Sequence, residues 1–200
     1  MNAKRLPQLI LASSSPRRSK LLQELDLPFQ VLTGRVEEIF PQYLTPHEIS
    51  QINAYHKART VAKKHPDALV IGADTLVCLG EQIFGKPHDL EEAHRMLSKL
   101  QGRTHQVVTG VCLIHLRTHR QKLFAESTTV TFRTLHSEQI RRYLSKIEPL
   151  DKAGAYAIQD EGDLIVKNVK GSYSNVVGLP LERIRNEFES WNTPPPLSEP

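Results

Sequence analysis

The sequence has few cysteines, few aromatic residues and no long apolar segment. It contains two cysteines and one tryptophan, and Phe, Trp and Tyr together make up 6% of its 200 residues. Cys78 and Cys112 lie in apolar runs without metal-ligand spacing, so we expect reduced core thiols and neither a disulfide nor a zinc site. No run reaches the ~20 apolar residues that span a bilayer, and polar SSSPRRSK stands at residues 13–20, where a signal peptide would have its apolar core. These absences predict a soluble, cytoplasmic protein without a membrane partner.

The chain also lacks a block of charge of one sign. Its formal net charge is +4 and its pI about 9.1, with the basic residues spread along the sequence. Without a basic and aromatic stripe of the kind that single-strand binders use, we expect no nucleic-acid partner, whereas a small phosphorylated ligand fits the charge. The length favours one domain over residues 1–191. The final NTPPPLSEP, residues 192–200, cannot continue a helix and is expected to be disordered.

The most apolar stretch is ALVIGADTLVCL, residues 68–79, which predicts a strand buried on both faces. It contains one carboxylate, Asp74. An unpartnered carboxylate there would lose several kcal/mol to desolvation, so we expect a cation, a metal or donated hydrogen bonds beside it. Side chains alternate along a strand, so Gly72 shares a face with Asp74 and is expected to leave open space next to it. A structural ion pair with a core-facing Arg or Lys is the alternative to a functional site.

A strand at Leu9–Ala12 leads through SSSPRR into a helix with Ser15 as N-cap and Pro16 in the first position. Free backbone N–H groups, hydroxyls and the pair Arg17 and Arg18 meet at this helix N-terminus, which predicts an anion site. It is not a P-loop, because the glycines and the Lys-Ser/Thr end of that motif are missing. A Ser-Pro cap with surface arginines is the alternative.

The clearest sequence signals for a helix lie at Thr45 to His65. A capping box of Thr45 and Glu48 begins this helix, and Pro66 ends it. Lys57 falls on or beside the inward stripe of this helix, among alanines, instead of on the polar face. Either it is directed at a buried partner or its stem follows the helix surface out to water.

The remaining elements are predicted from turn and capping signals. Lys86 lies between Gly85 and Pro87 in a turn after the buried strand, and Glu37 and Glu38 lie in a loop, where carboxylates are usually just solvated. The histidines at 115 and 119 are expected at the surface. Further elements are a strand at 29–32, a helix capped by Asp89, a hairpin of strands 105–116 and 122–132 projecting from the main sheet, a helix capped by Ser137, a strand at 164–169 and a last helix opened by Pro180.

Strands alternating with helices predict an α/β protein on a mixed sheet. Three polar features are unusual for such a fold: a loop that could bind an anion, two lysines in constrained settings, and two acidic positions. Hydrolysis of a polyphosphate requires such groups, since negative charge on its oxygens must be neutralised while water attacks. Oxygen ligands without a Cys/His set favour Mg²⁺ or Mn²⁺.

The residues also carry a resemblance. LASSSPRR, TGRVEE, NAYHKA, GADT, GKP, LQGRTHQVVTGV, EPLDKAGAYAIQ and GSYSNVVGLP follow one another as in the Maf family of nucleoside triphosphate pyrophosphatases, over about Leu9 to Leu181. The resemblance implies an elongated mixed sheet flanked by helices, with two lobes around a cleft, as in inosine triphosphatases. It also implies cleavage of a nucleoside triphosphate to the monophosphate and pyrophosphate, assisted by a divalent metal cation, and leaves a homodimer open.

Roles follow from the resemblance position by position. Asp74 is similar to the family's catalytic carboxylate, which binds metal or takes a proton from water. Further positions resemble the phosphate-binding loop (Ser13, Arg17) and the polar groups around the triphosphate (Glu38, Lys57, Lys86), with Glu38 and Asp74 as the implied metal ligands.

The AGAYAIQ form is similar to the branch that prefers dTTP and UTP, in which Arg17, Thr75 and Gln159 match the positions that select the base. A glutamine amide can offer a donor and an acceptor to a pyrimidine edge. This chain has Asp160 where that branch has Gly, and a Cβ there disfavours a positive φ. Two alternatives are the same chemistry on purine or modified nucleotides and a non-catalytic nucleotide-binding regulator linked to cell division.

Overall fold

A long mixed sheet runs through the computed structural model, which describes residues 6–191. Seven strands form it in the order β2-β1-β3-β5-β6-β7, with β4 paired to β3 off this path. Their bounds are β1 Leu9–Leu11, β2 Phe29–Val31, β3 Leu69–Leu79, β4 Gln82–Phe84, β5 Thr104–His115, β6 Arg120–Phe132 and β7 Val166–Lys170. The pairs β1–β2 and β1–β3 are parallel and the others antiparallel, which confirms the predicted α/β class and mixed sheet.

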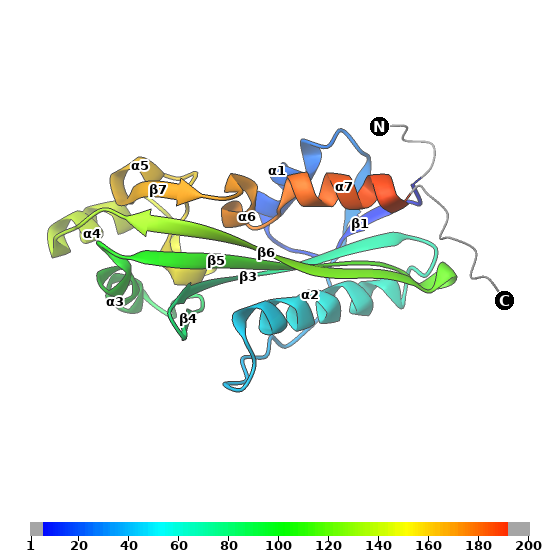
Figure 1. The fold of residues 1–200 in the computed structure, drawn as a ribbon, viewed down its shortest axis with the longest axis horizontal. Helices are drawn as coiled ribbons and strands as arrows, with labels where there is room; N and C mark the ends of the chain where they lie inside the picture. Colours follow the sequence, from blue (N-terminus) through cyan, green and yellow to red (C-terminus); the bar gives the residue numbers. More distant parts are fainter. Residues whose placement is uncertain (1–5, 192–200) are drawn as a thin grey trace.

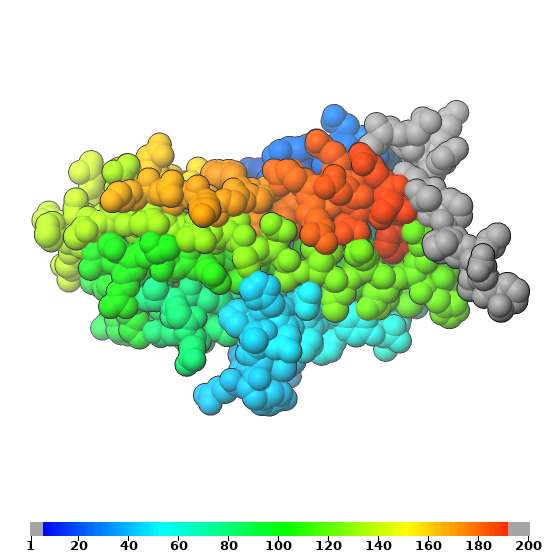
Figure 2. Space-filling view, in the orientation of Figure 1, coloured from blue at the N-terminus to red at the C-terminus, as the bar shows by residue number. Residues whose placement is uncertain are grey.

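Helices cover both faces of this sheet (Figure 1). They are α1 Pro16–Gln23, α2 Pro46–Ala62, α3 Leu90–Leu100, α4 Ser137–Leu144, α5 Gly162–Ile165, α6 Tyr173–Val177 and α7 Leu181–Trp191, with 3₁₀ turns η1 Leu116–Thr118, η2 Pro149–Asp151 and η3 Ala153–Ala155. Leucines of α1 and apolar residues of α7 pack with Leu69, Ile71 and Ala73 of β3. The opposite side chains of β3 face α2. Figure 2 shows the resulting elongated body, from which the segment leading into α2 protrudes.

Local signals explain the best-predicted elements. The capping box of Thr45 and Glu48 starts α2, with Glu48 Oε2 accepting from the Thr45 N–H at 2.8 Å. β3 is buried along most of its length, as its unbroken apolar composition predicts. Cys78 and Cys112 are buried free thiols, which confirms that expectation, and burial raises their pKa values to about 11 and about 12.

Gly72 does not leave the open space that the sequence suggested. A Cβ on Gly72 would overlap the backbone of Ala54 in α2, and one on Gly110 of β5 would overlap the backbone of Ser50. Gly110 pairs with Asp74 across the two strands. The two glycines therefore let α2 approach the sheet closely, so helix backbone occupies the space beside Asp74.

The sheet has a gap along one edge of β3. On this edge of β3, β1 covers Leu69–Ile71 and β4 covers Val77–Leu79. Within residues 6–191 no strand pairs with Gly72–Leu76 on this edge. Asp74 and Thr75 therefore lie at an opening in the sheet, beside the carboxyl end of β1.

Several predictions about elements are wrong. The β5–β6 hairpin does not project from the main sheet but lies within it, between β3 and β7. Residues 162–165 form helix α5 before β7, and the N-cap of α4 is His136 instead of Ser137.

His115 is buried. Its ring nitrogens lie 2.8 Å from Thr118 Oγ1 and 3.1 Å from the carbonyl oxygen of Asp67, whereas His119 is exposed as predicted. Within the described part, no helix has the length and apolar character needed to cross a membrane. The segment expected to be disordered, 192–200, lies outside the described residues.

Candidate functional site

A cleft of about 650 Å³ opens at the gap beside β3. Its walls come from the β1–α1 loop, the loop after β2, α2, β3, the turn after β4 and the segment around η2 and η3. It has almost equal polar and apolar character, unlike a second, smaller apolar pocket near the chain start. All eight residues singled out from the sequence line it, namely Ser13, Arg17, Glu38, Lys57, Asp74, Thr75, Lys86 and Gln159.

Lys57 joins two carboxylates in this cleft. Its Nζ donates to Asp74 Oδ1 at 2.6 Å and to Glu38 Oε1 at 2.7 Å. The Asp74 side chain is 6% exposed and that of Glu38 is 32% exposed, so the pair runs from the sheet interior to the cleft mouth. Asp74 thus has the ion-pair partner that its burial demands, and the pair faces the cleft instead of being sealed in the core.

Glu38 is held in its charged form. Burial alone would raise its pKa, but the charge of Lys57 and its hydrogen bond, with smaller effects of Lys86 and Arg18, lower the pKa below its ordinary value. Glu38 is therefore a charged oxygen ligand at the cleft mouth, and Lys57 joins it to Asp74. Within residues 6–191 no cluster of three or more His, Cys, Asp or Glu side chains could hold a metal ion by itself.

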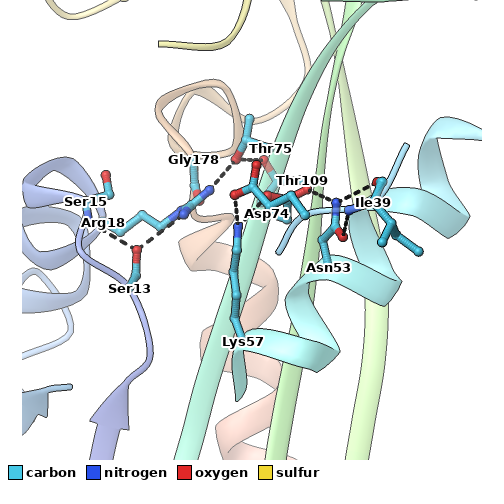
Figure 3. A network of polar contacts seen from close by, with 11 residues as sticks. Ser13, Ser15, Arg18, Ile39, Asn53, Lys57, Asp74, Thr75, Thr109 and Gly178 are labelled. Carbon is cyan, nitrogen blue, oxygen red and sulfur yellow. Dashed lines mark hydrogen bonds and ion pairs between the residues drawn. The ribbon is translucent and has the colours of Figure 1, made fainter. Parts of the chain in front are cut away.

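Arg18 reaches the cleft from α1, whereas Lys57 reaches it from α2 (Figure 3). Its Nε donates to the Gly178 carbonyl at 2.8 Å, and its terminal nitrogens donate to Ser13 Oγ at 3.3 Å and Thr75 Oγ1 at 2.9 Å. Burial lowers the pKa of Arg18, while Asp74 acts to raise it. No carboxylate among the described residues pairs with it, and two of its five N–H groups have no protein acceptor in these bonds.

Two successive hydrogen bonds determine the direction in which the Thr75 hydroxyl donates its proton. Thr109 Oγ1 donates to the Asn175 carbonyl at 3.0 Å, so it accepts from Thr75 Oγ1, which lies 3.0 Å away. Because Thr75 also accepts from Arg18, its hydroxyl retains only acceptor capacity toward a ligand.

Arg17 makes a different set of contacts from its neighbour. It donates to Asp151 Oδ2 at 2.7 Å and to the Asp151 carbonyl at 3.2 Å. Lys152 Nζ binds the other carboxylate oxygen of Asp151 at 2.8 Å. Arg17 and Asp151 both line the cleft and are 134 residues apart, so this contact connects its two sides.

Lys86 and Gln159 are exposed residues of the cleft wall. Neither side chain has an ion-pair or hydrogen-bond partner within residues 6–191, and both remain available to a ligand. Asp160 is not among the residues with positive φ, so its Cβ introduces no such strain. The next residue, Glu161, has a positive φ of 56°.

Sequence reasoning missed two residues of this site. Arg18 was recognised only as half of an arginine pair, and the role in the phosphate loop was given to Arg17. Asn53 was not singled out, although it lies one helical turn before Lys57 on α2 and donates to Asp74 Oδ2 at 3.1 Å. Its position i−4 to Lys57 was the available signal.

Comparisons with known proteins agree on one family. A family model described as "Maf-like protein" matches residues 8–191. The dTTP/UTP pyrophosphatase of Bacillus velezensis is 46% identical over 186 residues, 92% of this chain and 97% of that protein. The dTTP/UTP pyrophosphatase of Ruminiclostridium cellulolyticum is 44% identical over 185 residues, 92% of this chain and 96% of that protein. A solved structure of a HAM1 protein from Coxiella burnetii aligns with 64% of this chain and 73% of its own at 15% identity and TM-score 0.42, which is too slight a likeness to add to the fold description.

Proposed function

Because this chain belongs to the Maf family, we propose that it is a nucleoside triphosphate pyrophosphatase acting on dTTP and UTP, with the monophosphate and pyrophosphate as products. One observation carries the proposal: Arg18 presents a guanidinium to the cleft, held by three neutral oxygens and paired with no carboxylate of the described chain. A partly buried cation without a directly bound carboxylate favours an anionic ligand in the cleft. A phosphate group matches the fork of a guanidinium.

The cations of the cleft bind the triphosphate and neutralise its charge. Arg18 and Ser13, at the N-terminus of α1, bind phosphate oxygens. Lys86, on the wall formed by the turn after β4, adds a second charge. Arg17 joins them when it leaves Asp151. Together these groups neutralise the charge that develops on the leaving pyrophosphate.

Asp74 acts on the attacking water. Its carboxylate accepts the proton of a water molecule directed at the α phosphate, and the bond between the α and β phosphates breaks. Lys57 holds Asp74 in place and keeps Glu38 charged beside it. The anhydride oxygen leaves with the pyrophosphate, so the step consumes one water and needs no other reactant.

Asp74 and Glu38 fit a magnesium or manganese ion. Mg²⁺ is commonly bound by one or two carboxylates together with substrate phosphates, and Asp74 and Glu38 are two carboxylates of the cleft that share Lys57. Within residues 6–191 no group of three or more His, Cys, Asp or Glu side chains forms a cage that would hold the ion without the substrate. When bound, such an ion supplies positive charge that neutralises the phosphate oxygens. Gln159 and Thr75 select the base, with the Gln159 amide as donor and acceptor and the Thr75 hydroxyl as acceptor.

The test is a panel of pyrimidine and purine triphosphates assayed for pyrophosphate release, with and without Mg²⁺ or Mn²⁺. We expect turnover of dTTP and UTP that depends on the ion. Asp74→Asn should lower kcat by about 10²–10⁴-fold, as for loss of a general base, while dTTP binding persists. Gln159→Ala should reduce the preference for pyrimidines.

Asp67→Asn is the matched control, because Asp67 is an exposed aspartate paired with Arg117 outside the cleft. Its kcat should equal that of the wild type. Unchanged turnover in Asp74→Asn would refute the mechanism. Tight nucleotide binding by the wild type without metal-stimulated hydrolysis would favour a regulator, and preferential turnover of purine triphosphates would refute the substrate assignment.

A further inference from the structure

Asn53 is a fully buried polar residue that contacts the catalytic machinery without lining the cleft. It lies on α2 with 0% of its surface exposed, and it is absent from the cleft wall. Its side-chain nitrogen donates to Asp74 Oδ2 at 3.1 Å and to the Ile39 carbonyl at 3.2 Å. Its side-chain oxygen accepts from the Ile39 N–H at 2.9 Å. Both amide hydrogens are thus used within the protein.

The first consequence concerns the direction of the Asp74 carboxylate. Lys57 binds Oδ1 and Asn53 binds Oδ2, as Figure 3 shows. With one donor fixed on each oxygen, rotation of the carboxylate would break at least one buried hydrogen bond. The lone pairs left for water or a cation therefore point in a set direction.

The second consequence concerns Glu38. The segment from Leu32 to Thr45 contains neither helix nor strand, so its backbone lacks the anchors of regular structure. Asn53 binds both the N–H and the carbonyl of Ile39, which follows Glu38 directly. This two-point contact fixes the backbone from which Glu38 reaches Lys57.

We propose that Asn53 is a positioning residue that sets the geometry between Asp74 and Glu38, the two carboxylates that share Lys57. It holds one carboxylate directly and the other through the backbone of Ile39. The inference rests on the proposed function, because the geometry of the two carboxylates matters for the proton transfer to Asp74 and for the divalent cation that Asp74 and Glu38 would hold. A residue that only fills space or ties the loop down would support folding without setting kcat.

The experiment compares Asn53→Leu, which keeps the branched shape of the side chain and removes all three hydrogen bonds, with Ser50→Ala. Ser50 is also fully buried on α2, but its hydroxyl binds only the carbonyl of His47 in the same helix. For each variant the folded fraction is measured by thermal unfolding, and kcat is expressed per folded molecule. Asn53→Ala replaces the leucine variant should the latter not fold.

We expect Asn53→Leu to lower kcat at least tenfold and to raise the Mg²⁺ concentration for half-maximal activity several-fold. The dissociation constant for dTTP without metal should stay within threefold, because Asn53 touches none of the phosphate-binding groups. Hydrogen exchange at the Ile39 amide should accelerate at least tenfold, since that N–H loses its acceptor. Ser50→Ala should leave all four quantities within twofold.

A kcat per folded molecule within twofold of wild type in Asn53→Leu would overturn the inference, and so would a loss no greater than that of Ser50→Ala. An equal fall in dTTP affinity and kcat would also overturn it, because Asn53 would then act on binding. These outcomes differ from failure of the proposed function, in which the wild-type protein itself hydrolyses no triphosphate.

Discussion

His105 is a histidine that the fold keeps uncharged. It is 2% exposed on β5, with its ring edge-on to Phe132 at 4.7 Å between centroids and its Nε2 2.9 Å from the Tyr156 hydroxyl. Burial lowers its pKa to about 4. The unfolded chain binds a proton at this histidine near pH 6.5, so between pH 6.5 and 4 it holds more protons than the native state. Stability is therefore complete above pH 6.5 and decreases as the pH falls toward 4.

This gives a prediction for acid stability. His105 should contribute a slope of about 1.4 kcal/mol per pH unit to the free energy of unfolding between pH 6.5 and 4. His105→Gln keeps a polar partner for Tyr156 but cannot titrate, so the free energy of unfolding of this variant should depend less steeply on pH, by up to the contribution of His105. Denaturant unfolding at several pH values measures this slope, with exposed His65→Gln as the control. Equal slopes in His105→Gln and wild type would disprove the assignment.

The residue scale also shows the limit of sequence reasoning. Arg17 and Arg18 are chemically identical and adjacent, and successive helix positions point about 100° apart. Which of them faces Ser13 and which faces Asp151 depends on how α1 is docked, and the sequence does not encode that locally. Asn53 escaped notice for a related reason, because a buried amide has no identifiable role until its partners, the Ile39 backbone and Asp74, are placed.

At the scale of elements, the position of α2 controls the site. This helix supplies Lys57 and Asn53, and it can reach Asp74 because Gly72 and Gly110 present bare backbone to it. The sequence predicted the helix and the strand separately, since capping and apolar composition are local. It did not predict their close contact, so Gly72 was misread as open space.

The close contact of α2 with Gly72 leaves no space for a side chain at this position. Gly72→Ala should lower the free energy of unfolding by about 1–3 kcal/mol, because its Cβ would overlap backbone atoms of α2 that cannot move independently. Displacement of α2 by a fraction of an ångström should also reduce kcat at least tenfold. Gly162→Ala is the control: its Cβ would meet Ile158 at 3.6 Å, an ordinary contact, and stability should change by less than about 0.5 kcal/mol. Wild-type kcat in Gly72→Ala would contradict this account.

At the scale of the whole molecule, the cleft is bridged by Arg17 and Asp151. Local signals predicted most strands and helices, but no local signal connects α1 to a turn 134 residues away. Burial acts to raise the pKa of Asp151, but the hydrogen bonds and charges of Lys152 and Arg17 together lower that pKa below its ordinary value. The side chains are 23% and 54% exposed, so the pair contributes only about 0–1 kcal/mol to stability.

A triphosphate that enters the cleft can therefore take Arg17 from Asp151 at small cost, and the two anions compete for one guanidinium. Asp151→Asn removes the competitor and a negative charge from the cleft wall, so the dissociation constant for dTTP should fall about two- to tenfold with little change in melting temperature. The gain should shrink at higher salt, where charges at the cleft mouth are screened. Arg17→Met combined with Asp151→Asn should abolish most of it, whereas Asp67→Asn, outside the cleft, should give none. Weaker dTTP binding in Asp151→Asn would mean that the bridge instead closes over the bound nucleotide, because opening it would then cost affinity.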